Sequence, residues 1–240
     1  MKCFAAIGCL LVGTQGALGH QPTMSDGSAI GPDSAIELDD IQLSRVIYHE
    51  ITEDATSLWL TFDVDGPQSL FVSLGLPLLD RLENFRPAFA VLGPGLPVIE
   101  LPIEVPEGLG GLLFETDEVL DPEVFDEPFS GTTSWILREE DVDLPEPGTY
   151  FIVAFVPSGE TGKLWVAPGD REDFTLADIL ELSGVLDDVR AFHETAGGGF
   201  PCFLFPLASV LILFPALSLL ANRLRDHTPG ARGPGGTSTC

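Results

Sequence analysis

Short segments of alternating apolar and polar residues recur from residue 44 to residue 167 and are separated by turns rich in glycine and proline. This alternation has the period of a strand with two different faces, and the spacing leaves little room for helices. The expected strands are Ser44–Ile51, Ser57–Val64, Ser69–Leu76, Ala88–Leu92, Val98–Val105, Leu112–Glu115, Thr132–Arg138, Tyr150–Val156 and Lys163–Ala167. The pattern predicts a mostly β chain whose residues 44–173 form a single β-sandwich or jelly-roll domain.

The end of this region carries the clearest local signals. Tyr150–Val156 and Lys163–Ala167 flank the polar turn SGETGK, which is typical of a hairpin. Residues 174–199 follow, and Ile179, Leu182, Leu186 and Val189 recur at helical spacing, with Ser183-Gly184 as an interruption. We expect one or two short helices there, and then a glycine linker at 197–199.

Both ends of the chain indicate a protein inserted in a membrane. Residues 1–19 have a lysine, an apolar run and small residues before His20, which predicts a secretory signal peptide. Residues 200–221 contain no charge and are long enough to span a bilayer as one helix. Arginines in the tail 222–240 place that tail in the cytoplasm by the positive-inside rule. A single-pass type I protein fits better than a lipoprotein or a lipid-anchored chain.

The charge is concentrated in the segment expected outside the cytoplasm. Residues 20–198 hold 36 acidic and 7 basic residues, a net charge of −29. Such a surface repels nucleic acid and attracts cations or basic proteins. All four cysteines lie outside this segment, so the domain has no disulfide and no thiolate metal site. Residues 20–43 are small, acidic and rich in turn formers, and are expected to be a flexible lead-in.

Three stretches suggest a family. The runs LWLTFDVDGPQSLFVSL, AVLGPG and PGTYFIVAFVPSGETGKLWVAPGD resemble the strand order of bacterial pre-peptidase C-terminal domains, which are secreted jelly-roll sandwiches. Tyr150 matches the first aromatic of the closing hairpin of those domains, and Trp165 replaces the second. The chain from 44 to 221 also resembles membrane-anchored extracytoplasmic proteins. The resemblance implies a fold and a location, and brings no activity with it.

Two sets of residues are candidate metal ligands. Asp63 and Asp65 in the sequence DVDG open like a calcium loop, although the glutamate expected at the twelfth position is replaced by Leu74. A tight turn explains the same residues. After signal cleavage His20 would be the N-terminus, and with His49 it could chelate copper. A solvated terminal histidine is the competing interpretation.

Signals of catalysis are weak. There is no G-x-S-x-G motif and no lysine after the glycines at 108–111, so neither a serine hydrolase nor a phosphate loop is indicated. Glu127, between aromatic residues and beside Pro128, is a candidate buried acid. We therefore expect a non-enzymatic, membrane-tethered module that binds or scaffolds a basic protein, a carbohydrate or a subunit of a membrane complex. A calcium or copper protein, and a hydrolase with paired carboxylates, remain as alternatives.

Overall fold

A computed structural model describes residues 21–128, 130–171 and 176–195, all of which belong to the first of two units, Met1–Gly198. This part of the chain is mostly β, with one α-helix, α1 (Leu176–Phe192), and short 3-10 turns at Pro32–Ser34 and Asp80–Leu82. The strands are β1 (Gln21–Met24), β2 (Ile36–Glu37), β3 (Arg45–Ile51), β4 (Ser57–Val64), β5 (Gln68–Pro77), β6 (Ala88–Gly93), β7 (Gly110–Phe114), β8 (Glu123–Glu127), β9 (Thr132–Leu144), β10 (Gly148–Phe155) and β11 (Gly162–Pro168).

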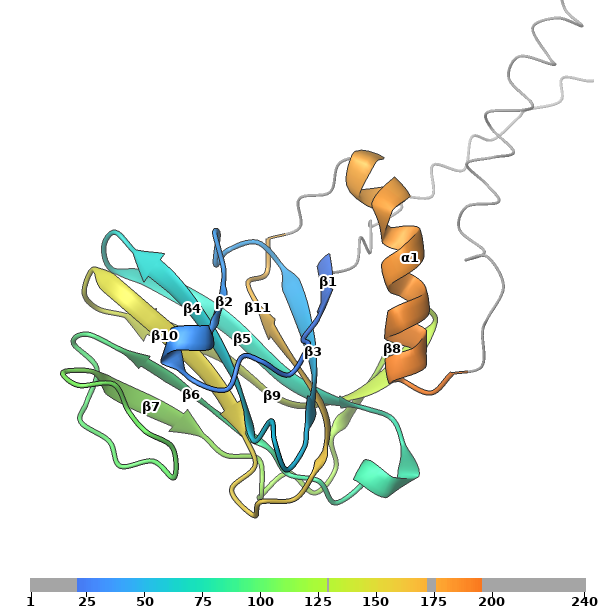
Figure 1. Cartoon of the computed structure of the whole chain (residues 1–240), viewed down its shortest axis with the longest axis horizontal. Helices are drawn as coiled ribbons and strands as arrows, with labels where there is room; N and C mark the ends of the chain where they lie inside the picture. Colours follow the sequence, from blue (N-terminus) through green and yellow to red (C-terminus); the bar gives the residue numbers. More distant parts are fainter. Residues whose placement is uncertain (1–20, 129, 172–175, 196–240) are drawn as a thin grey trace, which may run out of the picture. The chain divides into compact units, whose positions relative to one another are not determined.

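The strands form two sheets that pack face to face as a sandwich (Figure 1). Sheet A has the order β1-β3-β11-β5-β9-β8, and sheet B has the order β2-β4-β10-β6-β7. Between them lies one apolar core to which both sheets contribute, including Leu60, Leu74 and Ile152, each completely buried. The predicted sandwich is therefore correct at the level of its two layers.

The predicted hairpin at 148–170 is wrong. β10 pairs with β4 and β6 in sheet B, whereas β11 pairs with β3 and β5 in sheet A, so the SGETGK turn carries the chain from one sheet to the other. The alternation of apolar and polar residues correctly predicts which side chains face the core. They are Tyr150 and Ile152 before the turn and Leu164 and Val166 after it. The alternation does not specify which strand is the neighbour, because either pairing buries the same faces.

The strand predicted at Val98–Val105 is also absent. Leu101, Ile103 and Val105 do alternate, and they pack as a loop on the outer face of sheet B. Prolines stand at positions 97, 102 and 106 of this stretch, and each lacks the N–H that a strand ladder requires. The loop thus keeps the two-residue period of a strand and covers the sheet from outside without joining it.

Residues 20–43 were expected to be a flexible lead-in, but the described part, from Gln21 onward, is built into the sandwich. β1 pairs in parallel with β3, and β2 pairs in parallel with β4. Ala29, Leu38 and Ile41 are buried in the main core. A few buried apolar residues are enough to anchor this segment, because their acidic and small neighbours can stay at the surface. The overall polarity of a segment is therefore a poor guide to whether it is ordered.

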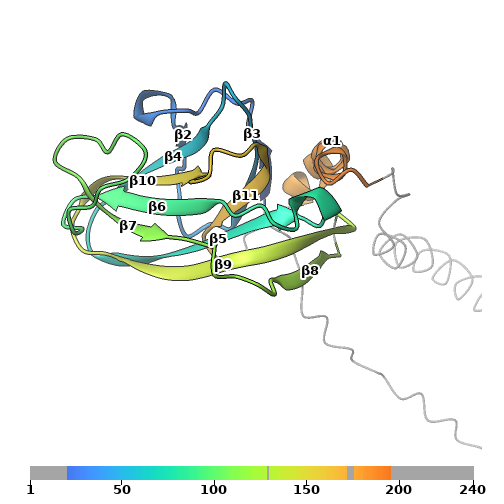
Figure 2. The ribbon, with the colours of Figure 1, turned by 90° about the horizontal axis from the view of Figure 1, so that it is seen from below.

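Helix α1 is continuous from Leu176 to Phe192, so Ser183-Gly184 does not divide it in two. It packs against the outer face of sheet A on the side of β1, β3 and β11. Figure 2 shows the helix next to β3 and β11. Leu186 and Val189 are buried, as their spacing predicts. Within the described ranges no helix combines the length and apolarity of a membrane crossing. The predicted signal peptide, the apolar stretch 200–221 and the tail that is predicted to be cytoplasmic all lie outside these ranges.

Candidate functional site

A cavity of about 120 Å³ opens on the outer face of sheet A, beside α1. It is lined by side chains from five strands of that sheet. They are Val46 and Tyr48 of β3, Phe71 and Ser73 of β5, Phe125 and Glu127 of β8, Thr132, Ser134, Ile136 and Glu139 of β9, and Trp165 and Ala167 of β11. Apolar and aromatic side chains thus surround a few polar groups, which is the usual composition of a ligand pocket.

The cavity lies where small side chains meet at the centre of the sheet. Ala167 is the register partner of Ser73, and Ser73 is in turn the partner of Glu139. Two of these three neighbouring positions therefore carry only one or two side-chain heavy atoms, and the outer surface of the sheet is hollow there.

Two residues further along each strand, on the same face of the sheet, the indole of Trp165 lies over Gly75. A Cβ atom added at Gly75 would lie 2.1 Å from Trp165 Cζ2. Glycine at this position lets the indole lie flat, and the indole then forms part of the cavity lining.

Ser73 is the most unusual polar group in the lining. It is only 4% exposed, and its Oγ has no hydrogen-bond partner within the described residues. A buried hydroxyl without a partner is unfavourable by about 1–3 kcal/mol. Such an atom in a cavity wall indicates a position where a ligand group can donate or accept a hydrogen bond.

Acidic groups flank the same cavity. Glu127 is half-buried and Glu139 is exposed, and both line it. Burial raises the pKa of Tyr48 well above its ordinary value, and the nearby Glu127 carboxylate raises it further. Among the described residues that line the cavity, the charged side chains are these two carboxylates.

A chain of hydrogen bonds connects the cavity to the end of α1. Trp165 Nε1 lies 3.2 Å from Ser134 Oγ, which lies 3.1 Å from His193 Nε2, while His193 Nδ1 lies 2.8 Å from the Val189 carbonyl oxygen. A carbonyl only accepts, so Nδ1 carries the proton and Nε2 accepts from the serine. Burial lowers the pKa of His193, which favours this neutral form.

Ser134 and His193 thus form a serine–histidine pair that the sequence did not reveal, because 59 positions separate them. The serine hydroxyl already donates to His193 and accepts from Trp165, and it is only 6% exposed. A nucleophile needs an accessible oxygen and a base that is itself oriented by a third group, usually an acid. Here the third group is a backbone carbonyl, so the pair serves to hold α1 on the sheet.

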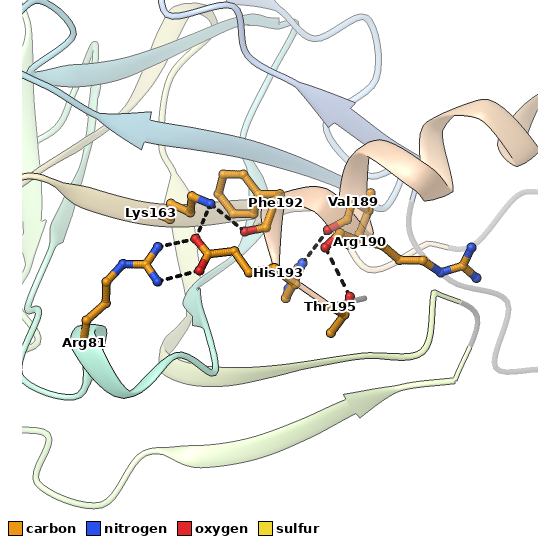
Figure 3. A network of polar contacts seen from close by, with 8 residues as sticks. Arg81, Lys163, Val189, Arg190, Phe192, His193 and Thr195 are labelled. Carbon is orange, nitrogen blue, oxygen red and sulfur yellow. Dashed lines mark hydrogen bonds and ion pairs between the residues drawn. The ribbon is translucent and has the colours of Figure 1, made fainter. Parts of the chain in front are cut away.

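Glu194 holds the C-terminal end of α1 from the other side. Its carboxylate forms a two-pronged ion pair with Arg81 and lies 2.9 Å from Lys163 Nζ, which also donates to the Phe192 carbonyl (Figure 3). These cations lower the pKa of Glu194 to about 2, with Arg81 contributing most.

The backbone at Glu194 is left-handed, with φ of 56°. The Thr195 N–H reaches the Arg190 carbonyl and the Glu194 N–H reaches that of Ala191, which is a Schellman cap. Glycine is the usual residue at this position, so the ion pairs of Glu194 offset the strain of its conformation.

Of the predicted metal ligands, His20 lies outside the described residues. His49 is in β3, is 1% exposed and points into the sandwich with Ile47 and Ile51. Its Nδ1 lies 3.0 Å from Ser25 Oγ, and burial lowers its pKa. It borders a second cavity of about 350 Å³ near Asp26 and Asp54, which neither Asp63 nor Asp65 lines.

Asp63 is the next-to-last residue of β4, and Asp65 begins the turn from β4 to β5. Asp63 Oδ1 accepts a hydrogen bond of 2.7 Å from Thr149 Oγ1 of the neighbouring strand β10, a structural role for this carboxylate. Among the residues that the structure describes, no group of three or more histidine, cysteine or acidic side chains is arranged to hold a metal ion.

Comparisons with known proteins add little. No family model and no curated protein matches this chain. The pre-peptidase C-terminal domain of a collagenase from Bacillus anthracis is similar at 9% identity over 62% of this chain and 96% of that domain, with a TM-score of 0.30. MopE, a secreted copper-binding protein of Methylococcus capsulatus, is similar at 10% identity over 64% of this chain and all of that one, with a TM-score of 0.27. At these TM-scores and identities, neither likeness supports a conclusion about this chain.

Proposed function

We propose that this chain is a non-enzymatic binding module, tethered to a membrane by residues 200–221 with its β-sandwich outside the cytoplasm. Its ligand is held in the cavity on the outer face of sheet A. The single observation that carries this proposal is the buried hydroxyl of Ser73, which has no hydrogen-bond partner among the described residues and lies inside an aromatic cavity. The tether rests on the signal-like segment 1–19 and the uncharged stretch 200–221 of the sequence.

The size of the cavity fits a small chemical group. At about 120 Å³ it is close to the roughly 150 Å³ engineered cavity that binds benzene in another protein. A larger partner can therefore insert one side chain, with the rest of its contacts on the acidic surface around the rim. The net charge of −29 over residues 20–198 favours a basic protein, including a basic subunit of a membrane complex, as that partner.

A pocket-filling substitution tests the proposal. Ala167 is 1% exposed and lines the cavity, so Ala167→Met fills it, while Ala191→Met adds the same group at an exposed position of α1. The full-length protein in detergent is screened by ligand-observed NMR against small fragments. We expect fragments that bind the wild type and Ala191→Met but not Ala167→Met. Binding that survives Ala167→Met in a folded protein would contradict the proposal.

A second candidate function has one observation in its favour. Glu127 and Glu139 line the same cavity, and a pair of carboxylates is what a hydrolase without metal or nucleophilic serine requires. The same NMR screen separates the two functions, because a hydrolase converts a bound glycoside or ester into product over time. Loss of turnover in both Glu127→Gln and Glu139→Gln, with binding retained, would establish the hydrolase.

A further inference from the structure

We propose that the cavity on sheet A binds an alkylammonium group, either the end of a lysine side chain or a small primary amine. The Ser73 hydroxyl accepts one of its hydrogen bonds, and the carboxylates of Glu127 and Glu139 supply the opposite charge. This inference rests on the proposed function, because it names the ligand class of the same site.

The position of Ser73 sets the first requirement on the ligand. Its Oγ is buried in the lining, and no residue of the described ranges forms a hydrogen bond with it. Its register partners on either side are Ala167, which has no polar side-chain atom, and Glu139. An ammonium carries three N–H donors and no acceptor, so it can satisfy a hydroxyl oxygen and nearby carboxylates together. An anionic ligand would instead meet two like charges.

The apolar part of the lining sets the second requirement. Four aromatic side chains line the cavity, among them Trp165, and a tryptophan face attracts a cation more strongly than other rings do. Val46 and Ile136 offer aliphatic surface to the methylene stem of the ligand. A bare metal cation does not fit this lining, since calcium needs six to eight oxygen ligands.

The protein already binds one ammonium group in the same way at another place. Lys163 Nζ lies 5.3 Å from the centre of the Phe192 ring, donates to the Glu194 carboxylate in an ion pair, and donates to the Phe192 carbonyl oxygen. Figure 3 shows this arrangement of an aromatic ring, a carboxylate and a neutral oxygen around the lysine. The cavity lining offers the same three kinds of group, and its described residues include no lysine to occupy them.

Calorimetric titration of the full-length protein in detergent tests the inference with n-butylammonium as the probe. Its neutral analogue n-butanol has the same stem and lacks the charge. We expect n-butylammonium to bind at least tenfold more tightly than n-butanol, and Ser73→Ala to weaken it several-fold. We also expect Glu127→Gln and Glu139→Gln to weaken it, whereas Glu107→Gln, an exposed acid in the loop on sheet B, leaves it unchanged. Equal affinity for the two probes, or no binding of n-butylammonium, would overturn the inference.

A third probe, Nα-acetyl-lysine amide, keeps the side-chain ammonium of lysine and identifies the source of the group that binds. Affinity comparable to that of n-butylammonium indicates a lysine of a partner protein, whereas binding of the free amine alone indicates a small molecule. The two proposals fail separately. If only neutral fragments bind, and Ala167→Met prevents their binding, the proposed binding function is supported and the proposal of an alkylammonium ligand is contradicted.

Discussion

The two sheets of this sandwich both present apolar outer faces, but the faces are covered in different ways. On sheet B, the loop after β6 lays Leu101, Ile103 and Val105 over Trp59 and its neighbours, and the face is sealed. On sheet A, α1 covers only the side of β1, β3 and β11, and the cavity remains beside it. The open face is therefore the one available to a ligand.

The geometry of the elements explains the difference. A helix with its side chains is about 10–12 Å wide, and strands lie about 4.8 Å apart, so one helix covers two or three strands. Sheet A has six strands, roughly 24 Å across, and a single helix must leave part of it uncovered. An extended loop follows the surface of a sheet more closely, which is why the loop on sheet B leaves fewer gaps.

The largest expected effect is on the sealed face. Trp59 is 2% exposed and packs edge-on against Phe151 with ring centres 5.7 Å apart. Trp59→Ala should reduce the free energy of unfolding by about 3–5 kcal/mol. Phe125→Ala, at the cavity on sheet A where the ring is 37% exposed, should reduce it by less than about 1 kcal/mol. Chemical denaturation followed by circular dichroism measures both, and equal losses would contradict the difference between the faces.

The next largest effect on stability is expected at Gly75, beneath the Trp165 indole in the cavity on sheet A. Gly75→Ala places a Cβ atom against the Trp165 indole and 2.4 Å from the Trp135 carbonyl oxygen, so the indole must move. We expect a loss of about 1–3 kcal/mol and altered ligand binding. Gly66→Ala, in a turn where the added atom meets nothing within 4 Å, serves as the matched control in the same denaturation experiment. A Gly75→Ala protein as stable as that control would show that the indole is not fixed as described.

A smaller effect is expected where the cover of sheet A is held by polar contacts. Ser134→Ala removes the hydroxyl between Trp165 and His193 and leaves the indole N–H without its acceptor. The expected loss is about 1–2 kcal/mol. Amide hydrogen exchange should show faster exchange in α1 and unchanged exchange in β4 and β10. Ser158→Ala, in an exposed turn, should change neither, and faster exchange throughout would mean that the bond supports the whole fold.

As the pH falls, the packing of α1 on sheet A should weaken before the packing of the loop on sheet B. The pKa of Glu194 is lowered to about 2 by Arg81 and Lys163, from an ordinary value of 4.5. The stabilisation is therefore complete above pH 4.5 and is lost as the pH falls toward 2. Between those values the melting temperature of the wild type should fall more steeply than that of Glu194→Gln. Parallel curves for the two proteins would contradict the role of this ion pair, and Glu107→Gln should follow the wild type.

How far the sequence predicts this molecule depends on the kind of information required. Strand β4 lies at the predicted residues 57–64, because alternation and the turn at Gly66 are local signals. The separation of β10 from β11 could not be predicted, because pairing is decided by contacts far apart in the chain. Strand β8 was missed because its sequence EVFDE is exposed and acidic, with little alternation to detect.

The candidate site was even less accessible to sequence reasoning. The sequence indicates Glu127 as a candidate acid between aromatic residues, and in the structure it lines the cavity. Ser73 and Ala167 carry no local signal, since small residues in a strand have many explanations. Their significance arises only from the register that sets them side by side on the face that α1 leaves open.

One measurement tests the central claim most directly. The chain has three tryptophans, and their indole N–H groups give separate signals in a nitrogen–proton NMR spectrum. Trp165 lies in the cavity on sheet A, whereas Trp59 lies under the loop on sheet B. Titration with n-butylammonium should shift the Trp165 signal in a saturable way and leave that of Trp59 in place. Equal shifts of both signals, or a stationary Trp165 signal, would contradict the account.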